Sequence, residues 1–169
     1  MKKYDVVIGI DPDVDESGVA FLIVESRILD VYSLPFADLL DYLREIRDIL
    51  TREGRYFVVV VEAGWLNKAH WHVGKGGSAA RSAAIGNHTG RNHEVGRKIV
   101  EMCRHYGIEV VEQPPLRKMW KGKDGKITYE ELQHFTGITG KTNQETRDAA
   151  LLAWEYAGLP IRIKNQYNK

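Results

Sequence analysis

The sequence lacks several features that would place a protein in a special class. Its 169 residues include one cysteine, Cys103, so no disulfide can form within the chain. No apolar run approaches the roughly 20 residues that cross a bilayer. Too few residues precede the first apolar segment for a secretory signal. These absences predict a cytoplasmic protein with reduced thiols and no membrane partner.

Net charge is also nearly absent, at +1, but the charges are unevenly distributed. Residues 64–126 hold twelve Lys and Arg against five Asp and Glu, a net of +7 that leaves −6 elsewhere. The same segment contains Trp65, Trp71 and Trp120. Basic groups mixed with flat aromatic rings are typical of surfaces that bind phosphates and unstacked bases. The structural alternative is a solvated basic face with tryptophans anchored in the core, and charge alone does not decide between the two.

The order of apolar segments predicts an α/β fold with a mixed five-stranded sheet flanked by helices. Short links make the first three strands an antiparallel meander, and the last two are expected to run parallel to the first. A break in the second helix is expected between Gly86 and Gly90. Without repeats or a linker, residues 1–169 are expected to form one domain. The predicted strands are 4–10, 18–25, 28–34, 56–63 and 108–113, and the predicted helices are 36–53, 79–106, 128–136 and 143–157.

Two carboxylates stand where strands of buried type end. Asp11 follows the run VVIGI, and Glu62 follows VVVV. If these strands pair in parallel, both acids lie at the sheet end where open α/β sheets place their crevices. A carboxylate there loses hydration unless it is paired or binds a cation. The alternative for Asp11 is an acid that caps the turn DPDVDESG.

A third acidic motif, ETRDAALLAW, places Glu145 and Asp148 on one face of the last helix. The simple alternative is that both acids favour the positive N-terminal end of that helix. If they meet Asp11 and Glu62, the all-oxygen site suits Mg²⁺ or Mn²⁺. Two such ions about 4 Å apart can promote phosphodiester cleavage.

These motifs resemble those of the RuvC-like branch of the ribonuclease H-like superfamily. VVIGIDP…SGVAFL is similar to the first family motif, VVVVEA to the second and ETRDAALLAW to the C-terminal one, in the same order. The resemblance implies a ribonuclease H-like fold and a homodimer that cleaves branched DNA, typically a four-way Holliday junction, with Mg²⁺ or Mn²⁺. It implies that two ions are held by the catalytic residues Asp11, Glu62, Glu145 and Asp148.

The chain departs from the family pattern in three places. The turn DPDVDESG is longer and more acidic than its Gly-rich counterpart, and the segments 64–90 and 116–127 match no familiar loop. The resemblance therefore supports the family's metal site in this chain more strongly than it supports the family's substrate. We expect DNA contacts from nine residues in the basic middle of the chain: Trp65, Lys68, Trp71, Lys75, Arg81, Arg91, Lys118, Trp120 and Lys121.

Weaker patterns predict less. The acids of the first turn are expected to be solvated, and the histidines lack the cysteine partners typical of a zinc site. The stretch GKGGSAAR lacks Walker spacing, so it predicts a DNA-contacting loop and no nucleotide cofactor. The residues concerned are Asp13, Asp15, Glu16, His70, His72, His88 and His93.

Two other functions stay open from the sequence. One is a non-cleaving module that binds branched DNA. The near-neutral net charge leaves this alternative open, although the +7 segment weakens the argument from net charge. A ribonuclease H-like nuclease that acts on RNA–DNA hybrid or on DNA ends is the other alternative.

Overall fold

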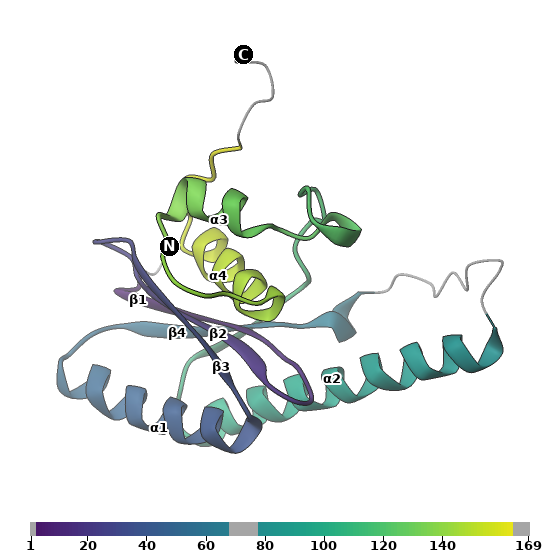
Figure 1. Ribbon diagram of the computed structural model, residues 1–169. Helices are drawn as coiled ribbons and strands as arrows, with labels where there is room; N and C mark the ends of the chain where they lie inside the picture. The colour runs from purple at the N-terminus through teal and green to yellow at the C-terminus, as the bar shows by residue number, and fades with distance from the viewer. Residues whose placement is uncertain (1–2, 68–77, 164–169) are drawn as a thin grey trace, which may run out of the picture.

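A mixed five-stranded sheet forms the centre of the protein (Figure 1) in a computed structural model that describes residues 3–67 and 78–163. The strand order is β3-β2-β1-β4-β5. The first three strands form an antiparallel meander, and β4 and β5 run parallel to β1, which confirms the predicted sheet. The strands are β1 (Val6–Asp11), β2 (Ser17–Ile23), β3 (Ile28–Leu34), β4 (Phe57–Glu62) and β5 (Val110–Gln113).

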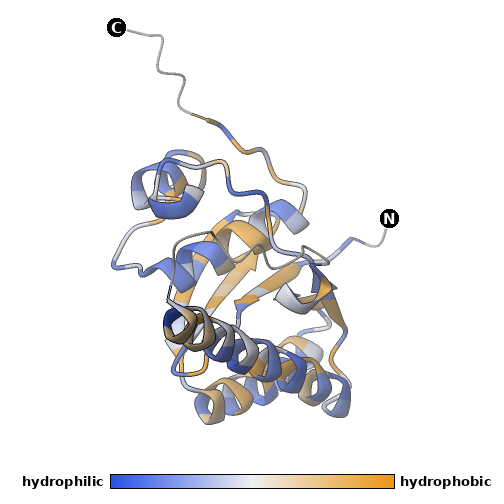
Figure 2. Cartoon of the chain, turned by 90° about the vertical axis from the view of Figure 1, so that its right-hand side faces the viewer, coloured by the Kyte–Doolittle hydropathy of each residue, from blue (hydrophilic) through white to orange (hydrophobic). Residues whose placement is uncertain are grey.

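Helices cover both faces of this sheet (Figure 1), which is why β1 and β4 are apolar on both sides. On one face, Val59 and Val61 pack beneath α1 and α2; on the other, Val58 and Val60 pack against α4. Figure 2 shows the strands largely in orange between helices that carry blue on their outer sides. The helices are α1 (Phe36–Arg52), α2 (Ala79–His105), α3 (Tyr129–Thr136) and α4 (Gln144–Tyr156).

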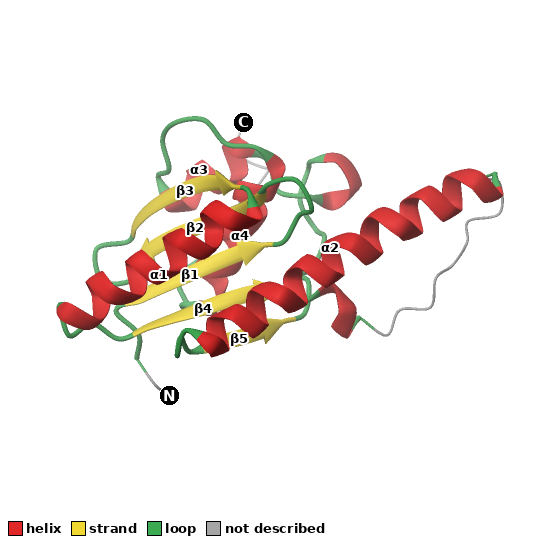
Figure 3. Ribbon diagram, turned by 90° about the horizontal axis from the view of Figure 1, so that it is seen from below, coloured by secondary structure: helices red, strands yellow, loops and turns green. Residues whose placement is uncertain are grey.

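Helix α2 is continuous, so the predicted break between Gly86 and Gly90 is wrong. Nothing lies within 4 Å of the position that a Cβ would take at either glycine, and each costs only about 1 kcal/mol relative to alanine. The first half of α2 projects beyond the carboxyl ends of the strands (Figure 3). Within the described residues, no helix combines the length and apolar character that a membrane crossing needs.

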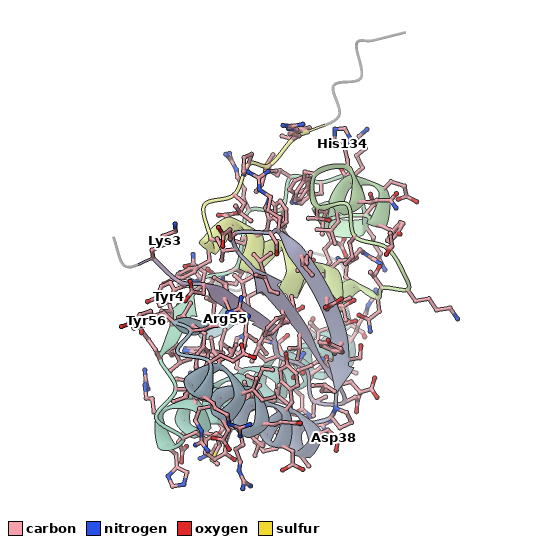
Figure 4. All side chains as sticks on the ribbon, turned by 90° about the vertical axis from the view of Figure 1, so that its left-hand side faces the viewer. Lys3, Tyr4, Asp38, Arg55, Tyr56 and His134 are labelled. Atoms are coloured by element: carbon pink, nitrogen blue, oxygen red, sulfur yellow. The ribbon has the colours of Figure 1, made fainter. Side chains whose placement is uncertain are left out.

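The two ends of the sheet are built differently. At the amino ends of β1 and β4, the Tyr56 backbone N donates to Asp5 Oδ2 (2.8 Å), and the Asp5 N donates to the Tyr56 carbonyl (2.8 Å). Figure 4 looks onto this end, where Tyr4, Arg55 and Tyr56 lie together. Because β1, β4 and β5 are parallel, their carboxyl ends share the opposite end, beside the projecting half of α2.

Candidate active site

Asp11 and Glu62 end neighbouring strands at this opposite end of the sheet. The parallel register pairs Ile10 with Val61, so the two acids are the next residues on β1 and β4. Both line a hollow of about 130 Å³ together with Asp148 of α4. The fold therefore brings three of the four predicted acids to one space from three separate elements.

Two glycines let α4 approach β1 and β2 closely enough to deliver Asp148. A Cβ at Gly9 would collide with the Ala149 carbonyl oxygen, and a Cβ at Gly18 would collide with the Glu145 carbonyl. Both clashes involve helix backbone, which cannot move aside as a flexible side chain can. The absence of side chains at these positions thus sets the distance between α4 and the sheet.

Asp148 has a partner for each of its carboxylate oxygens. Gln144 Nε2 donates to Oδ1 at 2.8 Å, and Lys126 Nζ lies 3.3 Å from Oδ2. The Asp148 side chain is 17% exposed, whereas that of Lys126 is 38% exposed. Asp148 is held by an amide of its own helix and by a cation from the segment that precedes α3.

Burial and mutual repulsion disfavour the charged acids. Burial, followed by the Glu62 and Asp148 carboxylates, raises the pKa of Asp11 well above its ordinary value, although Lys126 opposes this. Burial and Asp148 also raise the pKa of Glu62, against Lys126 and Lys118. Burial alone would lower the pKa of Lys126, but Asp148 and Asp11 outweigh it and raise that pKa. The hollow therefore favours a bound cation.

Glu145 lies at the margin of this group. It is half-buried in the first turn of α4, and its carboxylate is the weakest of the acids that raise the pKa of Asp11. It is absent from the described residues that line the hollow. Its position also suits the positive N-terminal end of the helix, the alternative weighed from the sequence.

The chemistry of the donor set fits a hard divalent cation. Asp11, Glu62 and Asp148 supply carboxylate oxygens, the ligands that Mg²⁺ and Mn²⁺ prefer. Across residues 3–67 and 78–163, however, no three Asp, Glu, His or Cys side chains are gathered closely enough to form a ready-made metal centre. The carboxylates share one space without converging on one point, and Asp148 is turned toward Lys126.

Basic side chains form another wall of the same hollow. Arg117, Lys118 and Lys126 line it together with Trp120. These residues precede α3, in a segment that includes the short 3₁₀ helix η2 (Lys123–Gly125). An anionic group that enters the hollow would meet cations on one side and, on the other, acids that a metal ion can neutralise.

A second hollow, of about 150 Å³, separates Asp11 and Glu62 from α2. Thr89, Asn92 and His93 of α2 line it with the two acids. Together, the two hollows give Asp11 and Glu62 open space on both sides. The acids therefore lie between α2 and the basic loop that precedes α3.

Helix α2 also fastens the turns that follow both acids. Asn92 Oδ1 accepts a hydrogen bond from the Val14 N (2.9 Å), and Asn92 Nδ2 donates to Asp13 Oδ2 (3.2 Å). A Cβ at Gly96 would crowd both the Trp65 ring and the Pro12 ring. The strands thus position the two acids, and α2 fixes the turns that follow them.

The predicted DNA contacts of α2 are only partly described. Arg81 and Arg91 are exposed on the helix, Arg81 in its first turn. The predicted contacts at Lys68, Trp71 and Lys75 lie outside the described residues. The exposed arginines are accessible to a long anionic ligand that passes over the carboxyl ends of the strands.

The other predicted DNA contacts differ in exposure. Lys118 and Lys121 are exposed. Trp120 lines the first hollow but also stacks on Phe135, with ring centroids 6.0 Å apart. Trp65 is half-buried, and its indole Nε1 donates to Glu112 Oε1 at 3.0 Å, an environment that favours the core alternative.

The acids of the first turn and the histidines differ in their surroundings. Asp15 and Glu16 are exposed in the first turn, whereas Asp13 is tied to Asn92. His88 is exposed, and His93 packs edge-on against Trp65 with centroids 6.2 Å apart. His70 and His72 lie outside the described residues.

Sequence reasoning missed Lys126, Gln144 and Asn92. Lys126 directly precedes the buried Ile127 in the basic loop, and this charged neighbour of a core residue was the one available signal. Gln144 and Asn92 carry no such signal. Their importance depends on contacts with Asp148 and with the first turn that only the fold creates.

Comparison with solved structures identifies the fold. The structure of T. thermophilus RuvC in complex with Holliday junction substrate aligns with 91% of this chain and 93% of that one, at 15% sequence identity and a TM-score of 0.50. The chain has a RuvC-like fold. The mixed five-stranded sheet agrees with the ribonuclease H-like fold that the sequence motifs implied.

Two further structures are less similar to the RuvC-like fold of this chain. A Thermus thermophilus RuvC structure covers 90% of this chain and 96% of its own length, at 18% identity and a TM-score of 0.42. The Fowlpox virus resolvase in complex with substrate Holliday junction DNA covers 90% and 97%, at 13% identity and a TM-score of 0.41. No protein-family model and no curated protein sequence matches the chain.

Proposed function

We propose that the protein is a divalent-metal-dependent endonuclease that cuts branched DNA, with a four-way junction as its substrate. The observation that carries the proposal is the shared hollow of Asp11, Glu62 and Asp148, whose remaining walls include Lys118 and Arg117. Phosphodiester hydrolysis by this mechanism requires carboxylates that bind metal ions next to basic groups that bind phosphate. The hollow supplies both. The T. thermophilus RuvC with the same fold was solved with a Holliday junction substrate, which supports the choice of DNA.

In this proposal, Asp11, Glu62 and Asp148 hold two Mg²⁺ or Mn²⁺ ions, with Glu145 as an outer ligand. The bound ions would activate a water molecule and stabilise the leaving oxygen of the phosphodiester. Other residues of the chain position these ligands. Gln144 orients Asp148 through its 2.8 Å hydrogen bond, and Asn92 holds the turn that follows Asp11.

The basic residues position the substrate. Arg117 and Lys118 bind phosphates beside the hollow, and Arg81 and Arg91 bind the backbone further along α2. We propose that a homodimer acts on the junction, because two equivalent sites related by a two-fold axis can cut two strands of a junction with similar symmetry. The proposed location is the cytoplasm, in which the buried Cys103 thiol stays reduced.

The test is incubation of the protein with labelled four-way junction, linear duplex and RNA–DNA hybrid, in Mg²⁺, Mn²⁺ or EDTA. We expect paired cuts in the junction only with a divalent ion, and a loss of at least about 100-fold in Asp11→Asn. Asp15→Asn, which alters an exposed acid of the same turn, is the control and should cut normally.

Other outcomes of this test identify other functions. Tight junction binding without cleavage in either metal would indicate the binding module. Faster cleavage of hybrid or of DNA ends would indicate a different ribonuclease H-like nuclease. Inert, folded protein on all three substrates would contradict the proposal.

A further inference from the structure

A lysine occupies the acidic hollow that the proposed metal ions would use. Lys126 Nζ lies 3.3 Å from Asp148 Oδ2 and lines the same space as Asp11 and Glu62. Among the described ion pairs, this is the one that involves a proposed metal ligand. The ammonium group thus already supplies positive charge where the acids need it.

Hydrogen bonds anchor the backbone around Lys126, so the loop holds its side chain beside the acids. Ile127 is buried, and its carbonyl accepts hydrogen bonds from Gln144 Nε2 (3.3 Å) and Arg147 Nε (3.2 Å), both on α4. The Lys126 carbonyl accepts a hydrogen bond from the Gly122 N (2.9 Å). The Ile127 carbonyl thus ties the segment to the helix that carries Asp148, and the Gly122 contact closes the loop itself.

We propose that Lys126 is a resident counter-ion, whose ammonium group neutralises the acids without metal and must leave Asp148 before a divalent ion binds there. This inference rests on the proposed function, because it assigns the metal to the same carboxylates. The geometry explains why those carboxylates are not gathered into a ready-made centre: Asp148 is turned toward Lys126 and Gln144.

Electrostatics makes the two cations alternatives. A divalent ion and an ammonium group at the same carboxylate repel each other strongly at a separation of a few ångströms. Lysine can yield, because its four-carbon stem is flexible and its side chain is 38% exposed.

The test measures metal binding directly, without cleavage. Mn²⁺ is titrated calorimetrically into wild type, Lys126→Met and Lys123→Met, and thermal unfolding is followed in EDTA and in Mn²⁺. Lys123→Met is the matched control, because Lys123 is an exposed lysine of the same loop. We expect Lys126→Met to bind the first Mn²⁺ about tenfold more tightly, and Lys123→Met to bind as wild type does.

Stability should change in the opposite direction without metal. In EDTA, Lys126→Met leaves the acids without their counter-ion, so its Tm should fall, and Mn²⁺ should remove the deficit. A merely structural lysine would lower the Tm equally in both conditions. If Lys126→Met does not fold in EDTA, Lys126→Gln is measured instead, since its neutral amide can still donate to Asp148.

Each outcome has a distinct meaning. Unchanged or weaker Mn²⁺ binding by both Lys126 variants would overturn the counter-ion role, while Mn²⁺ binding that depends on Asp11 would leave the proposed function intact. Wild-type protein that binds no Mn²⁺ and cuts no junction would overturn both. Tighter binding with a Tm deficit restored by Mn²⁺ would support both.

Discussion

The burial that stabilises the strand of Asp11 disfavours the charge of its carboxylate. Burial and the carboxylates of Glu62 and Asp148 raise the pKa of Asp11. A raised pKa in the folded state means that the acid favours folding most when protonated, below the unfolded pKa of about 4. That contribution is lost as the pH rises through the folded pKa, so the metal-free protein should be less stable at neutral pH than a protein without this acid.

Asp11→Asn should therefore stabilise the metal-free protein at neutral pH, by about 3 °C in Tm. The gain should vanish below about pH 4, where wild-type Asp11 is protonated. Mg²⁺ should raise the Tm of wild type and have little effect on the variant. Calorimetric melting in EDTA and in Mg²⁺ across this pH range measures both effects. A Tm gain that is the same at every pH would contradict the electrostatic explanation.

The sequence predicts the positions of Asp11 and Glu62 because a strand end fixes where its last side chain lies. Lys126 could not be found in this way. Its place depends on how the segment after β5 returns to α4, through the burial of Ile127 and the hydrogen bonds to its carbonyl. Contacts between distant residues set that path, and no local pattern encodes them.

Helix α4 shows how an element, rather than a side chain, places a ligand. Its backbone rests against β1 and β2 at Gly9 and Gly18, where no Cβ can fit. The apolar face of α4, with Leu152 and Trp154, is buried in the cluster on that face of the sheet. The position of Asp148 therefore depends on residues that never touch a ligand.

Two glycine-to-alanine substitutions should have opposite effects. Gly9→Ala forces α4 away from the sheet and should cost about 1–3 kcal/mol in the free energy of unfolding, with weaker Mn²⁺ binding. Gly86→Ala lies in helix α2 with nothing near its Cβ, so it should stabilise by about 0.5–1 kcal/mol. Urea unfolding and Mn²⁺ titration of both variants measure this. Normal metal binding by a folded Gly9→Ala would disprove that α4 packing places Asp148.

The elements themselves were largely predictable, since their apolar periodicity survives in the fold. The strands agree with the prediction to within two residues at each end. The predicted break in α2 is wrong because glycines weaken a helix without interrupting its hydrogen bonds. The projection of α2 past the sheet also escaped prediction, because periodicity gives the length of a helix but not its position.

At the level of the whole molecule, described parts of the +7 segment, residues 64–126, lie on two sides of the acids. One part is the projecting half of α2, and the other is the loop with η2. Figure 1 shows these two regions on either side of the carboxyl ends of β1 and β4. A net charge of +1 thus conceals a surface suited to a polyanion, with the acidic hollow in its middle.

Junction binding should accordingly weaken steeply with salt. In EDTA, the logarithm of the association constant should fall with the logarithm of salt concentration with a slope of about −4 or steeper. Arg91→Ala should reduce that slope by about one, through loss of one phosphate contact. Arg55→Ala, at the other end of the sheet (Figure 4), should leave it unchanged. Fluorescence anisotropy measures the slopes, and a flat dependence would exclude a phosphate-dominated interface.

The most direct test is a crystal structure of wild-type protein soaked in Mn²⁺, with anomalous data collected at the manganese absorption edge. We expect anomalous density between the carboxylates of Asp11, Glu62 and Asp148, with Lys126 turned away from Asp148. Carboxylate oxygens more than about 10 Å from one another, or manganese bound elsewhere, would contradict a shared metal site.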